Sequence, residues 1–184
     1  MLFGDRNDFA IEAGLEPDLQ PPSQVWGHMC VWCRGISLGD ITERHCGFSS
    51  AYSGFVWLAS NLDRLWAVEF EALDDVALWN FLDGILYGYH GLVELQDDRT
   101  VEECQRDSNM WHHYDFLTNW DEQFDGYKAF IVCPPGGEIC ILSRDSSEKM
   151  CRAIVSRDGF LAAVDGFKRW YDGEELRLQS ARLN

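Results

Sequence analysis

Apolar and polar residues alternate in the first part of the chain, as is typical of β-strands. Between Asp8 and Glu16 the apolar residues fall on one face and the acids on the other, which predicts a strand with one solvated face. Residues 25–34 are apolar on both alternating faces and predict a central strand. Gly35 then leads to a short strand at residues 36–38, and the three runs together predict a meander.

Between residues 50 and 66 the apolar residues recur nearly every four positions instead of every two, which predicts an amphipathic helix. A second helix is expected to start at Asp74, a suitable N-cap, and to continue to Leu86. Apolar residues occupy nearly the whole circumference of this helix, so we expect other elements to cover it on two sides. Residues 100–103 have the Thr-x-x-Glu form of a capping box and predict a short acidic helix ending near Ser108.

The last third of the chain contains the clearest hairpin signal. Two strand-like runs, residues 127–133 and 138–142, flank a Pro-Pro-Gly-Gly turn. Residues 151–155 predict a further strand. Ser156 is a suitable cap for a final helix, which we expect Gly173 to end. The residues beyond it are polar and are expected to be peripheral.

These elements predict a single α+β domain over residues 1–184, with a mainly antiparallel sheet covered by two to four helices. A chain of this length buries roughly two-thirds of its unfolded surface, so it has a sizeable core. We expect N-terminal strands in residues 1–45, a helical pair in 50–90, C-terminal strands in 111–155 and a C-terminal helix in 156–172.

Charge is the least ordinary property of the composition. The chain has 15 basic and 31 acidic residues, a formal net charge of −16. Residues 91–126 contain ten of the acids and two of the bases, which is half of the net charge. A phosphate backbone would be repelled by such a surface, so direct nucleic-acid binding is disfavoured.

The location of the protein is predicted from what the sequence lacks. No apolar run approaches the roughly 20 residues needed to cross a bilayer. Asp5 and Asp8 stand where a secretory signal would be basic and then apolar. The seven cysteines are an odd number scattered among regular elements, which favours reduced thiols over a disulfide framework. We therefore expect a cytoplasmic protein with no membrane partner.

Cys30 and Cys33 form a Cys-x-x-Cys motif, with His45 and Cys46 a short distance downstream. This is one way to start a zinc site. If the segment is an extended strand, however, the two thiols point to opposite faces and cannot share an ion. No second motif completes the set, so no metal and no cofactor are expected.

The stretch from Trp111 to Phe130 combines large aromatic residues, four acids and two adjacent histidines. His112 or His113 with Asp115 would be a candidate general base, since a carboxylate fixes an imidazole tautomer. No nucleophile elbow, Walker loop, zinc-protease motif or dinucleotide fingerprint supplies the rest of an active site. We therefore expect structural histidines and no catalytic residue.

Three carboxylates, Asp121, Glu122 and Asp125, lie within five residues of one another. They could attract a divalent cation, but their spacing does not fit an EF-hand loop. A solvated acidic turn before the strand at Tyr127 explains them more simply. A solvated turn does not explain the aromatic residues among these acids. Trp beside fixed charges is typical of interface hot spots.

Several segments, in this order, resemble immunity-protein family 42 of bacterial polymorphic toxin systems. The likeness extends from Leu2 to about Trp170. The segments that carry it are Leu-Phe-Gly-Asp at 2–5, Phe-Ala-Ile-Glu at 9–12, Val-Trp-Gly-His-Met-Cys-Val-Trp at 25–32, Leu-Gly-Asp at 38–40, Tyr-Gly-Tyr-His at 87–90 and Phe-Leu-Thr-Asn-Trp-Asp-Glu-Gln-Phe-Asp-Gly-Tyr-Lys at 116–128.

The resemblance implies a non-enzymatic antidote that binds a cognate toxin, including toxins delivered by secretion machines such as type VI. It does not transfer toxin contacts residue by residue, so those are predicted from composition. A surface this acidic favours a basic toxin acting in the cytoplasm, for example a nuclease. The predicted toxin-binding residues are Asp97, Asp98, Trp111, Trp120, Asp121, Glu122 and Asp125.

Two alternatives remain open from the sequence. One is a small enzyme or metal-binding protein that uses His112 or His113, or Cys30 and Cys33. The other is an antidote that reverses the toxin's chemical modification enzymatically. A stable one-to-one complex is expected only of an antidote that binds. The oligomeric state is not determined by the sequence.

Overall fold

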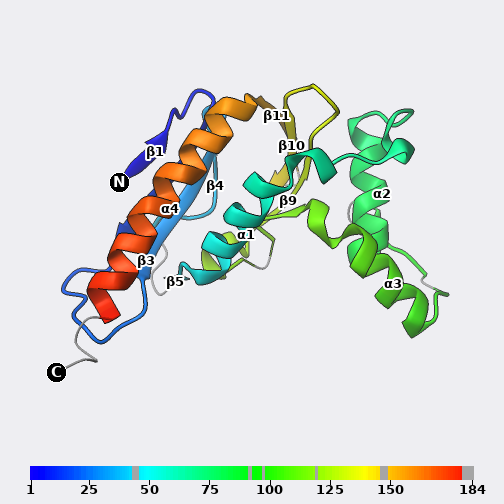
Figure 1. Ribbon diagram of the computed structural model, residues 1–184. Helices are drawn as coiled ribbons and strands as arrows, with labels where there is room; N and C mark the ends of the chain where they lie inside the picture. The colour runs from blue at the N-terminus through cyan, green and yellow to red at the C-terminus, as the bar shows by residue number, and fades with distance from the viewer. Residues whose placement is uncertain (43–45, 91–92, 97, 119, 146–148, 180–184) are drawn as a thin grey trace.

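The computed structural model describes residues 1–42, 46–90, 93–96, 98–118, 120–145 and 149–179. Figure 1 shows two antiparallel sheets with helices between and beside them. The predicted α+β class is confirmed, with the strands divided between two sheets and a small hairpin. No helix in the described part of the chain is long and apolar enough to cross a bilayer.

The N-terminal sheet has the order β1-β2-β3-β4, with β5 also paired to β3. Its strands are β1 (Leu2–Gly4), β2 (Phe9–Leu15), β3 (Trp26–Cys33), β4 (Ile36–Leu38) and β5 (Cys46–Gly47). The alternation in β2 buries Phe9, Ile11 and Ala13, and β3 is central, as the sequence predicts. The short strands β1 and β5 were not predicted, because two or three residues are too few to show a period.

The C-terminal sheet has the order β11-β10-β9-β8. Its strands are β8 (Asp115–Phe116), β9 (Tyr127–Val132), β10 (Ile139–Asp145) and β11 (Met150–Val155). The predicted hairpin is confirmed: Cys140 pairs with Val132, and Gly136 adopts a φ of +67° in the turn. The strand predicted at residues 151–155 is β11, paired to β10 along its length.

Four α-helices and several 3₁₀ turns complete the described chain. The helices are α1 (Ser49–Ser60), α2 (Asp75–Tyr87), α3 (Val101–Trp111) and α4 (Arg157–Gln179). The 3₁₀ turns are η1 (Leu62–Arg64), η2 (Val68–Phe70), η3 (His112–Tyr114) and η4 (Glu122–Phe124). A hairpin of β6 (Tyr89–His90) and β7 (Val93–Glu94) follows α2.

The predicted helix starts are confirmed atom by atom. The Asp74 carboxylate accepts a hydrogen bond from the Ala77 amide at 2.8 Å. Thr100 and Glu103 form a complete capping box at the start of α3. The Ser156 hydroxyl accepts from the Gly159 amide at 3.0 Å.

Three predicted helix ends are wrong. The helix predicted over residues 50–66 stops at Ser60, and η1 follows it. Helix α3 continues past Ser108 because Trp111 is buried against α2. Helix α4 passes through Gly173 to Gln179, because Leu178 is fully buried and holds the last turn in place. Burial therefore outweighs the weak helix propensity of one glycine.

Phe55, on α1, joins the two sheets and α4. Its ring centroid lies 6.4 Å from that of Phe9 on β2, 6.3 Å from Phe116 on β8 and 5.8 Å from Phe167 on α4. Trp120 closes the cluster with its ring edge-on at 5.0 Å. In Figure 1, α1 lies between α4 and the strands β9 to β11. This aromatic cluster is the part of the core that fixes the sheets relative to each other.

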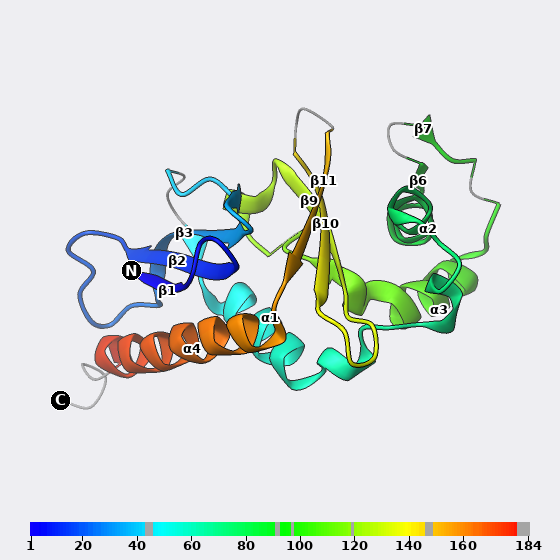
Figure 2. The ribbon, with the colours of Figure 1, turned by 90° about the horizontal axis from the view of Figure 1, so that it is seen from above.

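Helices α2 and α3 lie on the opposite side of the C-terminal sheet from α4, as Figure 2 shows. Trp79 of α2 packs on Phe130 of β9, with ring centroids 4.8 Å apart. The buried Asp83 carboxylate accepts a hydrogen bond from Lys128 Nζ at 2.7 Å. Helix α2 is thus covered by the sheet on one side and by α3 on another, as predicted.

Substitution of Gly54 by Ala tests the aromatic cluster. A Cβ at this position would lie 2.4 Å from the Trp120 ring, which is itself wedged against Phe55 and Phe116. We expect Gly54→Ala to lower the free energy of unfolding by about 1–3 kcal/mol, measured by urea denaturation.

Gly173→Ala is the matched control, because it is also a helical glycine and nothing lies within 4 Å of its added Cβ. This variant should be more stable than the wild type by about 0.5–1 kcal/mol. Equal effects of the two substitutions would contradict the proposed close contact at Gly54.

Candidate functional site

Four carboxylates from three separate segments line one surface hollow of about 480 Å³. We call it the acidic hollow and define it by Asp40, Glu122, Asp125 and Asp145. Asp40 follows β4, Glu122 and Asp125 belong to η4 and its end, and Asp145 is the last residue of β10. All four side chains are solvent-exposed.

Local backbone contacts bring these segments together. Gly39 adopts a φ of +95°, and a Cβ there would lie 2.6 Å from the Phe124 ring. Only glycine therefore lets the chain pass this close to η4. The Asp40 amide then donates to the Gln123 carbonyl at 2.9 Å. Opposite them, Tyr127 pairs with Asp145 in the β9–β10 register.

The hollow has a defined electrostatic character. Hydrogen bonds from the Thr42 hydroxyl and amide to the Asp40 carboxylate, at 2.6 and 2.8 Å, lower its pKa. Burial, followed by the charges of Asp145 and Asp40, raises the pKa of Tyr127, so its phenol stays protonated. The hollow therefore presents carboxylates and one phenol to a partner.

Both carboxylate oxygens of Asp121 accept hydrogen bonds from backbone amides and so stabilise the fold. Oδ2 accepts from the Gly47 amide at 3.0 Å and Oδ1 from the Glu122 amide at 2.9 Å. The carboxylate thus fastens η4 to β5. Of the three acids predicted as a group, Glu122 and Asp125 are exposed in the acidic hollow, while Asp121 holds the segment that carries them.

The two predicted tryptophan anchors lie in different environments. Trp111 is only 8% exposed and packs against Phe81 and Phe70, so it has no accessible ring face for a partner. Trp120 is half-buried against Phe55 and lines a small hollow of about 190 Å³. Only Trp120 retains accessible surface, and Trp111 is excluded from the surface proposed below.

The predicted acids before α3 are separate from the acidic hollow. Asp98 is exposed and precedes α3, which packs on α2. Asp97 lies outside the described residues. Helix α3 runs outward from the sheets, so its N-terminus lies at the far end of the molecule from β3 (Figure 1). The predicted toxin-binding residues therefore lie on two separate surfaces.

The two histidines have structural surroundings. His112 Nδ1 lies 3.0 Å from the Ser108 carbonyl, and His113 stacks on Tyr114 with ring centroids 4.1 Å apart. Burial, then His112 and Arg64, lower the pKa of His113. Burial raises the pKa of the Asp115 carboxyl, the nearby Thr118 and Tyr87 hydroxyls oppose this effect, and no histidine is among the groups that shift it.

Cys30 and Cys33 are buried on β3, three positions apart, and so lie on opposite faces of the strand. Burial raises the pKa of Cys30 to about 12 and that of Cys33 further still, which disfavours the thiolate that a metal requires. His45 lies outside the described residues. Among the residues that the structure does describe, no group of three or more His, Cys, Asp or Glu is placed to hold a metal ion.

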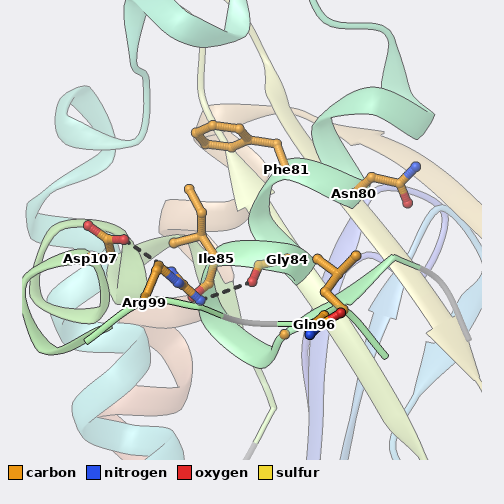
Figure 3. Close-up of a pocket in the computed structure, with 9 residues that line it drawn as sticks. Asn80, Phe81, Gly84, Ile85, Gln96, Arg99 and Asp107 are labelled. Atoms are coloured by element: carbon orange, nitrogen blue, oxygen red, sulfur yellow. Dashed lines mark hydrogen bonds and ion pairs between the residues drawn. The ribbon is translucent and has the colours of Figure 1, made fainter. Parts of the chain in front are cut away.

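A second hollow, of about 340 Å³, opens between α2, the segment after β7 and α3. Phe81, Ile85 and Leu95 form its apolar walls, as Figure 3 shows for the first two. Arg99 closes one side and is hydrogen-bonded to the end of α2. No local sequence pattern predicted this hollow, because its walls come from α2, the segment after β7 and α3.

Asp40, Asp145 and Tyr127 are also absent from the predicted site. Asp40 follows the short strand predicted at residues 36–38, and Asp145 lies beyond the strand predicted at residues 138–142. Their convergence depends on the pairing of β9 with β10 and on the packing of η4 on β3. No local pattern in the sequence encodes those contacts.

The described residues thus define an acidic α+β protein in which four exposed carboxylates meet at one hollow, while Cys30, Cys33 and His113 pack within the fold. The sequence profile of the family described as Immunity protein 42 matches residues 1–170. The chain belongs to this family, which confirms the resemblance. It is an immunity protein, and its family implies a cognate toxin as partner and a non-enzymatic role.

A search of curated proteins gives no match. Among solved structures, CdiI from Burkholderia dolosa AUO158 is similar, with a TM-score of 0.63 and 13% sequence identity. The likeness covers 92% of this chain and 99% of that chain. At this identity it shows a shared fold.

The partly buried Asp115 predicts a pH dependence of stability. Burial raises the pKa of its carboxyl from 3.8 to about 6 in the folded protein, so the folded state binds the proton more tightly than the unfolded state. The contribution of the Asp115 carboxyl to the free energy of unfolding is present at low pH and is lost as the pH rises through about 6. Relative to wild type, Asp115→Asn should gain up to roughly 3 kcal/mol between pH 4.5 and 7.

Urea unfolding at a series of pH values measures this difference. Asp98→Asn, at an exposed carboxylate, controls for the amide substitution itself. A difference between Asp115→Asn and wild type that does not change with pH would contradict the assignment.

Proposed function

We propose that this immunity protein neutralises its toxin by stoichiometric binding, and that the toxin is basic and acts in the cytoplasm, as a nuclease would. The acidic hollow is the proposed docking surface. The observation that carries the proposal is the convergence of Asp40, Glu122, Asp125 and Asp145 from three segments onto one exposed hollow.

Electrostatics supports a basic partner. A net charge of −16 attracts a cationic protein over distances of about a Debye length and raises its association rate. A cluster of carboxylates also resembles the charge of a phosphate backbone. Docked on a nuclease, it would compete with the anionic substrate for the same basic residues.

Rigidity of the hollow supports tight binding. Gly39 fits against Phe124, Asp121 fastens η4 to β5, and the β9–β10 register holds Asp145 opposite Tyr127. The carboxylates are therefore presented by segments that are tied to the sheets. A surface ordered before binding loses less conformational entropy in the complex.

Reversal of charge at Glu122 and Asp125 tests the docking surface. We expect the double variant Glu122→Lys/Asp125→Lys to associate with the toxin domain about tenfold more slowly at low salt, with a weaker salt dependence. Stopped-flow or surface-plasmon measurements with the toxin domain encoded beside this chain would measure the rate. Asp121 is left unchanged, because its carboxylate holds the fold.

Glu69→Lys/Glu71→Lys is the matched control, since it makes the same change in net charge at two exposed acids beside η2. It should slow association much less. If both variants slow association equally, net charge alone is responsible and the acidic hollow is not the docking surface. A wild-type chain that forms no one-to-one complex with the toxin would contradict stoichiometric inhibition and favour enzymatic reversal.

A further inference from the structure

The hollow between α2 and α3 is mainly apolar and lies outside the acidic hollow. Phe81 and Ile85 reach it from α2, and Leu95 reaches it from the segment after β7. Asn80 and Gln96 form part of its rim (Figure 3). Its volume of about 340 Å³ is enough to take one large side chain of a partner.

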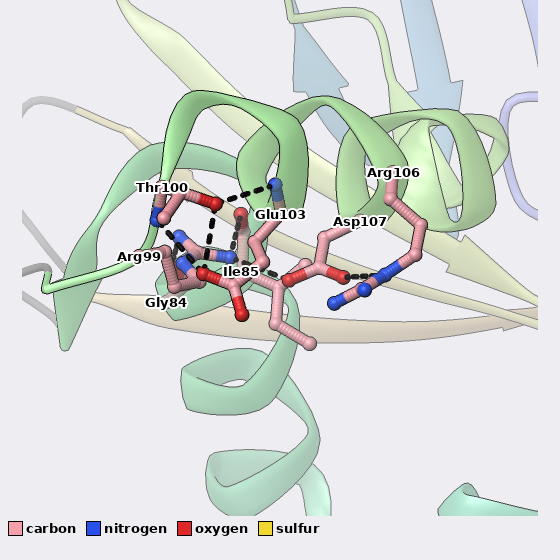
Figure 4. Close-up of polar contacts among 7 residues, drawn as sticks. All are labelled: Gly84, Ile85, Arg99, Thr100, Glu103, Arg106 and Asp107. Carbon is pink, nitrogen blue, oxygen red and sulfur yellow. Dashed lines mark hydrogen bonds and ion pairs between the residues drawn. The ribbon is translucent and has the colours of Figure 1, made fainter.

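Polar groups beside the hollow are satisfied within the chain. The Arg99 guanidinium donates to the carbonyls of Ile85 at 3.2 Å and Gly84 at 3.4 Å, near the C-terminal end of α2. It also pairs with Asp107 of α3 at 3.0 Å (Figure 4). A cation at this helix end is favourable, because it complements the carbonyl dipoles. The network fixes the shape of the hollow and leaves its apolar walls for a ligand.

The α2–α3 region also exposes large apolar side chains. Val76, Val93, Val101 and Met110 are between 51% and 78% exposed. They lie on α2, β7 and α3, and exposed apolar side chains on the elements around an apolar hollow are typical of protein–protein contact sites. Figure 2 shows that α2 and α3 form one end of the molecule, accessible to another protein.

The charge of this end selects the kind of partner. Glu94, Asp98 and Glu102 are exposed on the segments that lead into and begin α3. A second copy of this chain would carry the same net charge of −16 and the same exposed acids, so it would be repelled. The complementary partner has an apolar side chain flanked by Lys or Arg.

We infer that the cognate toxin inserts a large apolar side chain between Phe81, Ile85 and Leu95 and places basic residues beside Glu94, Asp98 and Glu102. The inference rests on the proposed function, since it takes the basic toxin as the occupant. It adds an apolar anchor to the electrostatic docking surface. Anchors of this type contribute mainly to slow dissociation, whereas rim charges contribute mainly to fast association.

Filling the hollow tests the inference without removing a core contact. Gln96 is exposed on the rim, and Gln96→Trp would occupy the space that the toxin side chain needs. We expect this variant to bind the toxin domain of the neighbouring reading frame at least about tenfold more weakly, through faster dissociation. Its melting temperature should equal that of the wild type. Calorimetry and surface-plasmon measurements give the affinity and the rates.

Gln105→Trp is the matched control, because Gln105 is exposed on α3 and does not line the hollow. It should bind as the wild type does. Asn80→Trp fills the hollow from the α2 side and replaces Gln96→Trp if that variant is destabilised. Wild-type affinity in a folded rim-filling variant would overturn the inference.

The charge-reversal variant separates this inference from the proposed function. In one outcome, the rim-filling variants bind more weakly while Glu122→Lys/Asp125→Lys associates at the wild-type rate. This result would support the apolar anchor and reject the acidic hollow as the docking surface. The opposite pattern would keep the acidic hollow and remove the anchor. A wild-type chain that does not bind the toxin domain would overturn both.

Discussion

The position of Phe55 is the constraint on which the rest of the structure depends. Its ring contacts β2, β8 and α4, so one side chain connects the N-terminal sheet, the C-terminal sheet and the longest helix. Gly54 leaves room for Trp120 to close the same cluster. In the described part of the chain the two sheets share no hydrogen-bonded strand, so their relative position depends on side-chain contacts, of which this aromatic packing is a large part. The acidic hollow, which draws residues from both sheets, depends on it in turn.

Most residues that the sequence offered as candidates for catalysis or metal binding have structural roles in the fold. The cysteines of the Cys-x-x-Cys motif are buried on opposite faces of β3, and His113 stacks against Tyr114. Asp121 ties η4 to β5. Of the four carboxylates in the acidic hollow, Glu122 and Asp125 were predicted, whereas Asp40 and Asp145 have ordinary sequence surroundings. This division fits a family whose members bind a toxin, since a binding surface needs rigid support and complementary charge and does not need a catalytic group.

The two proposed contact regions would contribute differently to one complex. The acidic hollow consists of exposed carboxylates, whose interactions are long-range and weakened by salt. The α2–α3 hollow consists of apolar walls, whose contribution is short-range and requires a fitting side chain. The first suits fast capture of many basic proteins, and the second suits discrimination among them.

The sequence by itself determined the longer strands, the helix starts and the family. Apolar periodicity and capping residues such as Asp74 act within a few positions and are visible in the residues. Only the tertiary structure decided where α3 and α4 end, that Trp111 is buried and that Asp40 meets Asp145 across the acidic hollow. Those outcomes depend on contacts between residues distant in the chain. Their free energy comes from packing and strand register, which no local pattern records.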